Sequence, residues 1–263
     1  MQISNTQWVG VVAGVAAALL VTGIIWFIPT KVEAPSSTST STPPVSATST
    51  APGTPAKVIY TGPFPVNSGE TISSWTFKGS YADSDILIAQ AKKDIAFLTD
   101  LLGKGKYDDY DLYNGRANDY TYLGDGTAAY KDYDRAIQIH PEKGIAYVNL
   151  ANLMVELRAY RTAADAYARA VAVEPGMLQY HVQRLTYLTG QFPTDNARIL
   201  EALTAVSKQF GDTSDILSIE AQWLAGQKRY ADAIKAWQTV KMLSPANRAA
   251  AIDAEIARLQ AKQ

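Results

Sequence analysis

The chain has 263 residues, of which 47% are hydrophobic, with 24 basic and 25 acidic side chains and no cysteine. A formal net charge of −1 leaves no basic surface that would neutralise phosphates, so we expect no nucleic-acid partner. The absence of cysteine excludes disulfides, thiolate metal sites and a cysteine nucleophile, but it does not indicate a compartment.

An uncharged apolar stretch follows a short flank, residues 1–7. Residues 8–29 read WVGVVAGVAAALLVTGIIWFIP, and as a helix they would be about 33 Å long, against a hydrocarbon core of about 30 Å. Trp8 and Trp26 stand near its ends, where aromatic rings prefer the headgroup boundary. We therefore predict a transmembrane helix. A cleaved signal peptide is the alternative, and it is disfavoured because no Lys or Arg precedes Lys31.

Small residues line one face of this predicted span. Gly10, Gly14 and Ala18 are four residues apart, so a second helix could approach closely and join two chains in a homodimer. The alternative is that Gly and Ala are simply frequent in membrane helices. The few charges that flank the span do not fix its orientation.

Residues 30–57 are predicted to be a disordered linker. From Ala34 they read APSSTSTSTPPVSATSTAPGTPAK, a composition that cannot bury enough apolar surface to offset chain entropy. Such a stalk would hold the following domain away from the bilayer. Because Ser/Thr/Pro stalks are typical of surface-exposed proteins, we expect a single-pass cell-membrane protein whose C-terminal domain lies outside the cytoplasm.

Two segments join the linker to the helical part. Residues 58–83 combine turn residues with short β-branched and aromatic runs, which indicates an extended segment or a hairpin. Trp75 and Phe77 alternate with polar neighbours, so we expect them to pack against the helices that follow. Residues 84–109 are predicted to form a packing helix that begins after Ser84 as N-cap.

A 34-residue period runs through residues 110–245. Tyr133, Ala136 and Pro141 recur 34 residues later as Tyr167, Ala170 and Pro175. The best copy reads Tyr147-x2-Leu150-Ala151-x2-Met154 and then Ala163-x3-Tyr167-x2-Ala170-x4-Pro175. It resembles the tetratricopeptide repeat (TPR), a helix-turn-helix unit with the pattern W-x2-L-G-x2-Y…A-x3-F…P.

Three further copies match less well. The first has Arg116 where Leu is expected, and the fourth, after Ser214, has Glu220 out of pattern. The third has Leu185 at a small-residue position, which would push its helices apart, and a QFPTDN loop that displaces its second helix by two residues. Residues 246–263 are predicted to form a capping helix. The resemblance implies an all-α fold, a TPR-type α-solenoid of about four repeats.

Amide side chains recur on the first helix of each unit. The resemblance implies that this helix lines a groove that binds a peptide or protein segment rather than performing chemistry. An amide offers donors and an acceptor to the backbone of an extended peptide. The predicted binding residues are Asn114, Asn118, Asn149, Asn152, Gln179, Gln183 and Gln222. The alternative is that these amides serve contacts between helices.

One TPR subtype holds a partner's C-terminal carboxylate with two Asn and several basic residues. Asn118 and Asn149 match its Asn positions, but Asn114, Gln179 and Gln183 stand where the basic residues should be. The charge pairing is therefore missing, and we do not predict this ligand.

The first copy is dense in Tyr and Asp. Its spacing ahead of Gly115 fails the EF-hand pattern. Repeat core positions take several of the tyrosines, which leaves four for a surface: Tyr107, Tyr110, Tyr122 and Tyr130. Two interpretations stay open, a solvated helical pair or an acidic patch that selects a cationic segment.

No catalytic constellation is found, since G-x-S-x-G, H-E-x-x-H and P-loop spacing are absent. His140 and His181 lie in different units, and we expect no enzyme activity, no metal and no cofactor. The sequence thus predicts a membrane-tethered module, with the lipid bilayer contacted through residues 8–29, that acts as adaptor, scaffold or holdase-like assembly factor. The alternatives are an oligomerising envelope protein without a peptide ligand and, with no motif in its favour, an enzyme that processes an envelope polymer.

Overall fold

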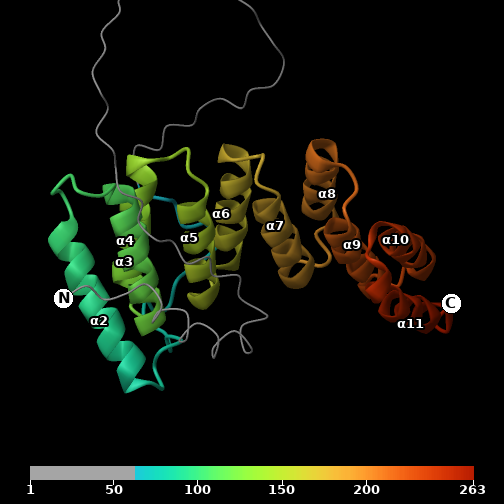
Figure 1. Ribbon diagram of the computed structural model, residues 1–263, viewed down its shortest axis with the longest axis horizontal. Helices are drawn as coiled ribbons and strands as arrows, with labels where there is room; N and C mark the ends of the chain where they lie inside the picture. The colour runs from blue at the N-terminus through green and yellow to red at the C-terminus, as the bar shows by residue number, and fades with distance from the viewer. Residues whose placement is uncertain (1–62) are drawn as a thin grey trace, which may run out of the picture.

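The computed structural model describes residues 63–263. The flank 1–7, the predicted transmembrane helix 8–29 and the linker 30–57 lie outside the described residues. Within 63–263, no helix is long and apolar enough to cross a membrane. The described helices follow one another in a row, from α2 at one end to α11 at the other (Figure 1).

The helices pair into successive hairpins. Their bounds are α2 Asp85–Leu101, α3 Asp109–Leu123, α4 Gly126–Ile139, α5 Ile145–Glu156, α6 Tyr160–Val173, α7 Leu178–Gln191, α8 Asn196–Phe210, α9 Ser214–Gly226, α10 Tyr230–Leu243 and α11 Ala249–Gln260, with a short 3-10 helix at Ala246–Arg248. The pairs α3/α4, α5/α6, α7/α8 and α9/α10 are the four predicted repeats, and α11 packs on α10 as their cap. We call α3, α5, α7 and α9 the A helices and their partners the B helices. The predicted all-α solenoid is confirmed.

The turn inside the hairpins repeats with the sequence period. Gly124, Arg158 and Lys228 adopt the left-handed conformation, with φ of 81°, 59° and 60°, between the A and B helices of the first, second and fourth units. Gly124 and Arg158 are one period apart, whereas Lys228 follows Arg158 by two periods and two further residues. The displacement predicted from the QFPTDN loop is therefore confirmed.

Small residues let the helices of one unit approach closely. Ala151 of α5 and Ala163 of α6 have no exposed surface, and Tyr147 and Met154 are equally closed to solvent. Full burial of each large side chain contributes about 1.5–3 kcal/mol. The 34-residue pattern thus marks the residues that hold the stack together.

The third unit is looser, as predicted. Leu185 is fully buried at the small-residue position, and α7 and α8 make fewer contacts with each other than the helices of the other units do. The hydrophobic core divides here into two clusters, one around α3 to α6 and one around α7 to α11, and Tyr187 packs against both.

Two expectations about the first unit are wrong. Tyr110 is not a surface residue: it is 1% exposed, and its hydroxyl oxygen accepts a hydrogen bond from the Ala146 amide at 3.3 Å. Nor is all of this unit's acidic content solvated, because Asp111, Asp132 and Asp134 are buried, while Asp125 is exposed. The sequence pattern missed that Asp132 accepts from Arg116 and that Asp134 accepts from the Phe64 amide and the Gln138 side chain, whereas the Oδ1 of Asp111 has no hydrogen-bond partner within residues 63–263.

Arg116 explains one of these buried carboxylates. Its Nε and Nη2 atoms donate to the two carboxylate oxygens of Asp132 at 2.6 and 2.8 Å, and its Nη1 donates to Thr99 at 2.8 Å. The two side chains of the ion pair are only 14% and 9% exposed. Arginine is tolerated at an apolar position of the repeat because a two-pronged ion pair satisfies it.

Candidate protein-binding surface

Among the A helices, α3 contacts α5 and α7 contacts α9, and the ring of Tyr180 on α7 lies against Gly144 at the start of α5. Helical spacing puts Gln179, Val182, Gln183 and Thr186 on one face of α7. The repeat period aligns this face with Asn149 and Asn152 on α5 and with Ile219 and Gln222 on α9. We call this surface of α5, α7 and α9 the amide row.

Two of the predicted binding residues pair with each other. The Nδ2 of Asn149 donates to the Oδ1 of Asn114 at 3.2 Å, which joins α5 to α3. Asn114 is 1% exposed and Asn149 is 9% exposed. This contact matches the alternative in which amides serve helix contacts, and Asn114 would reach a partner only after a rearrangement. Helix α2 covers this end of α3, because Leu98 lies over Gly115.

A tyrosine orients the next amide in each of the first two units. The Tyr133 hydroxyl donates to the Oδ1 of Asn118 at 2.6 Å, and the Tyr167 hydroxyl donates to the Oδ1 of Asn152 at 2.5 Å. Both tyrosines lie on B helices fifteen residues after their amide, and the two pairs are one period apart. This repeated pair was visible in the sequence but was missed there.

The tyrosines act as hydrogen-bond donors at any physiological pH. Burial raises the pKa of Tyr167 to about 12, and burial also raises the pKa of Tyr133. Each tyrosine hydroxyl donates its hydrogen bond to the Oδ1 of its asparagine. Residues 63–263 provide no acceptor for the Nδ2 of Asn118 or Asn152. Both asparagines are half-buried, so their NH2 groups remain available to donate to a partner.

The glutamines of the row differ in their surroundings. Gln179 and Gln222 are exposed, and no residue within 63–263 hydrogen-bonds their side chains. Gln183 is half-buried, and its Oε1 is enclosed without accepting a hydrogen bond. Repeat position thus assigns Asn152, Gln179, Gln183 and Gln222 to the same face of their A helices, and peptide binding by these residues stays a prediction.

The segment before α2 lies on the B helices instead of on this row. We call residues 63–83 the strap. Phe64 is 2% exposed, its amide donates to the Asp134 carboxylate at 2.8 Å, and its carbonyl accepts from the Tyr130 hydroxyl at 2.5 Å. Its ring packs edge-on against Tyr147 at 6.0 Å between centroids. The strap is thus anchored in the core from the side of α4 and α6.

Further along, the strap supplies the cap that α6 lacks. Ala159 stands at the N-cap position and has no side-chain acceptor. The Glu70 carboxylate accepts from the amides of Arg161 and Thr162 at 2.5 and 2.8 Å and from the Thr162 hydroxyl at 2.7 Å. A carboxylate at this end of a helix pairs with free N–H groups and with the helix dipole.

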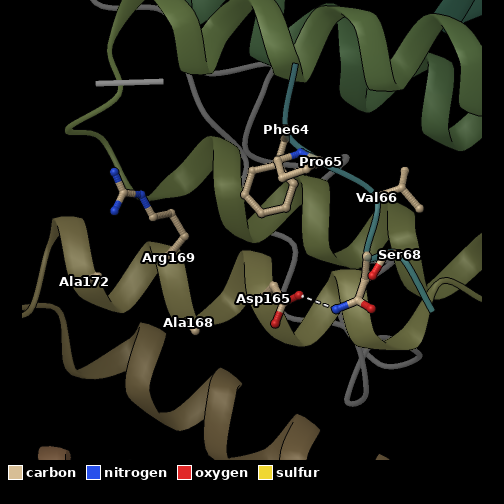
Figure 2. Close-up of a pocket in the computed structure, with 9 residues that line it drawn as sticks. Phe64, Pro65, Val66, Ser68, Asp165, Ala168, Arg169 and Ala172 are labelled. Carbon is tan, nitrogen blue, oxygen red and sulfur yellow. Dashed lines mark hydrogen bonds between the residues drawn. The ribbon is translucent and has the colours of Figure 1, made fainter. Parts of the chain in front are cut away.

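The strap also pairs with α6 through Asn67. The Asn67 side chain donates to Asp165 at 3.0 Å, the bond drawn as a dashed line in Figure 2, and its backbone amide donates to the Thr162 hydroxyl at 2.9 Å. Between strap and helix lies a hollow of about 630 Å³. Figure 2 shows it bordered by Phe64 to Ser68 and by Asp165, Ala168, Arg169 and Ala172.

The end of the strap fits against the turn between α3 and α4. Gly126 donates to the Trp75 carbonyl at 2.9 Å, and Thr76 forms an isolated antiparallel bridge with Asp125. A Cβ atom on Gly79 would lie 2.1 Å from the Tyr122 carbonyl oxygen, so only glycine fits there. Trp75 and Phe77 pack against the core as expected. The segment pairs with this turn, and within residues 63–83 it forms no hairpin.

No protein-family model matches the chain, and no curated protein matches it. Among solved structures, the chain is similar to YrrB, described as a TPR protein with an unusual peptide-binding site, at 18% identity over 64% of this chain and 85% of that chain, with a TM-score of 0.47. It is also similar to a tetratricopeptide repeat protein from Parabacteroides merdae ATCC 43184, at 15% identity over 65% and 78%, with a TM-score of 0.33.

These similarities are too distant to carry a conclusion about function. The fold is assigned from the chain itself, through its four hairpins, the left-handed turn that three of them share and the buried 34-residue pattern. Residues 63–263 therefore form an α-solenoid of tetratricopeptide type.

Proposed function

We propose that the chain is a protein-interaction module that binds an extended segment of a partner protein along the amide row. One observation supports this proposal above the others: the strap, residues 63–83, hydrogen-bonds to α4 and α6, and within residues 63–263 no hydrogen bond joins it to the row on α5, α7 and α9. The oriented NH2 group of Asn152 and the exposed amides of Gln179 and Gln222 offer donors and acceptors to a peptide backbone.

The membrane tether is part of the proposal. The apolar residues 8–29 and the Ser/Thr/Pro linker favour a domain held on a stalk outside the cytoplasm, where it would act as an adaptor, scaffold or assembly factor. An interaction surface on a long linker searches a large volume near the bilayer. No catalytic motif of the sequence favours an enzyme, and residues 63–263 contain no grouping of three or more His, Asp or Glu side chains that could hold a metal ion.

The test compares two double variants of the full chain in mild detergent. Gln179→Ala/Gln222→Ala removes exposed amides from the row, and these side chains hold no intramolecular hydrogen bond within 63–263. Gln209→Ala/Gln238→Ala removes two exposed amides from the B helices α8 and α10. Each protein is used to capture partners from a membrane extract of the source cells, and the captured proteins are quantified by mass spectrometry.

We expect the row variant to lose at least one protein that the wild type and the B-helix variant both retain. Truncating exposed side chains changes stability by no more than about 0.5 kcal/mol, so a loss of binding would not come from unfolding. Equal capture by all three proteins would mean that the amide row does not bind the partner proteins.

A further inference from the structure

The amide row contains no positive charge, and this absence restricts the kind of segment it can bind. The A helices contain only two cationic side chains, Arg116 and Arg184. Arg116 is paired with Asp132 on α4, and Arg184 is paired with Glu201 on α8. Both guanidinium groups therefore point to the B helix of their own unit, and their side chains are only 14% and 12% exposed.

The charges that do lie on this face are acidic and few. By repeat position, Asp111, Glu156 and Asp215 belong to the same face of the A helices as the amides. Asp111 is 6% exposed, and burial raises the pKa of its carboxyl, whereas Glu156 and Asp215 are exposed. Glu156 stands at the end of α5 and Asp215 at the start of α9; α7 has no acidic residue, and its one arginine, Arg184, is paired with Glu201.

The uncharged part of the row has short side chains of two kinds. Val155, Val182 and Ile219 are half-buried aliphatic residues, and Thr186 and Thr189 add hydroxyls between them. Amides and hydroxyls pair with peptide N–H and C=O groups, and the aliphatic residues offer shallow apolar contact. A carboxylate brought onto this surface would lose hydration and find no cation, at a cost typical of an unpaired charge.

We propose that the row selects an uncharged, extended segment and rejects acidic segments. This inference rests on the proposed function and adds the chemistry of the partner. Selection works by exclusion: an acidic side chain over α7 would meet no unpaired guanidinium or ammonium group of the A helices, because Arg184 is paired with Glu201. Affinity for the neutral segment does not depend on ionic strength, since no ion pair forms.

The probes are three labelled peptides of equal length. The neutral peptide is SSTSTSTPPVSATSTAP, the sequence of residues 36–52 of this chain, which contains only small uncharged side chains. The acidic and basic peptides replace four of its serines by Glu or by Lys. Binding to the full chain in mild detergent is measured by fluorescence anisotropy at low and at high salt.

A gain-of-charge variant makes the test specific to the row. Gln179→Lys/Thr186→Lys places two ammonium groups on exposed positions of α7, and Gln209→Lys/Gln238→Lys places two on the B helices as the control. The wild type is expected to bind the neutral peptide at least tenfold more tightly than the acidic one and within about threefold of the basic one, since tenfold is 1.4 kcal/mol. The row variant reverses the preference toward the acidic peptide, and the control variant does not.

The outcomes separate this inference from the proposed function. Binding of the acidic peptide as tight as that of the neutral one overturns the inference, and so does a tenfold preference for the basic peptide, which would mean that the acidic residues choose a cationic partner. If no peptide binds, the inference fails. The proposed function fails only if capture of partners is also unaffected by Gln179→Ala/Gln222→Ala.

Discussion

Replacement of Glu70 by alanine tests how the strap is held away from the amide row. Glu70 accepts three hydrogen bonds at the start of α6, from the Arg161 amide, the Thr162 amide and the Thr162 hydroxyl, at 2.5 to 2.8 Å. Loss of an N-cap costs about 0.5–2 kcal/mol, and bonds to a charged acceptor are at the strong end of that range. Because water can replace part of the cap at this half-buried site, we expect Glu70→Ala to lower the free energy of unfolding by about 2 kcal/mol.

The assay combines stability with local exchange. For a domain of this size, about 2 kcal/mol corresponds to a fall in Tm of about 4–8 °C. Hydrogen exchange should accelerate at the amides of Arg161 and Thr162, because these lose their acceptor. Glu70→Gln keeps one acceptor oxygen and should lose about half as much. Glu156→Ala, an exposed glutamate at the end of α5, is the control and should stay within about 0.5 kcal/mol of the wild type.

Two results would refute the capping role of Glu70. Equal stability of Glu70→Ala and Glu156→Ala would mean that the three hydrogen bonds contribute nothing net. A loss of stability without faster exchange at Arg161 and Thr162 would place the effect elsewhere in the fold. Either result would mean that the hydrogen bonds of Glu70 do not hold the strap on α6.

Two further changes probe buried charge. Burial and the nearby Asp94 raise the pKa of Asp119 to about 7, so the folded state holds a proton that the unfolded state releases, and the free energy of unfolding should fall as the pH rises from about 4 to about 7. Screening at this partly exposed site limits the effect to about 1–2 kcal/mol. Asp119→Asn should remove this pH dependence, and an unchanged slope of unfolding free energy against pH in that variant would contradict the raised pKa. Arg116→Leu restores the apolar repeat residue but leaves the buried Asp132 carboxylate without its cation, so the free energy of unfolding measured in urea should fall by about 3 kcal/mol. The double variant Arg116→Leu/Asp132→Leu should recover the stability of the wild type to within about 1 kcal/mol. A double variant as unstable as the single one would mean that Arg116 does not stabilise the fold through this ion pair.

The periodic part of the fold could be predicted from sequence because its signals are local. Small residues such as Ala151 and Ala163 mark close helix contacts, and Gly124 and the 34-residue spacing mark the hairpin turns. The extra residues of the QFPTDN loop appear directly as a shift of the turn at Lys228. Each of these features depends on neighbours within one or two repeats.

The strap could not be placed in this way, because its contacts join residues far apart in the chain. Glu70 meets Thr162, and Phe64 meets Asp134 and Tyr130, with separations of 66 to 92 residues. No repeat period predicts such pairs. The missing N-cap at Ala159 was a local sign that α6 needs an outside acceptor, but it does not say which carboxylate supplies it.

The amide row was predicted from repeat position, and the structure divides its members. Asn114 and Asn149 are joined to each other, and Asn118 and Asn152 are held by tyrosines, because the neighbouring unit or B helix offers a partner. The sequence placed them on a common face but could not tell which of them a guest would reach. Exposure depends on how α2 and the adjacent units pack, which is a property of the whole stack.

Site-specific photo-cross-linking tests the central claim most directly. A photoreactive amino acid is placed at Gln179 or Gln222 on the row and, as the control, at Lys235 on the exposed side of α10, in the full chain within its own cells. We predict cross-links to another protein from both row positions and none from Lys235. Cross-links from Lys235 alone, or from none of the three positions, would contradict the amide row as the binding surface.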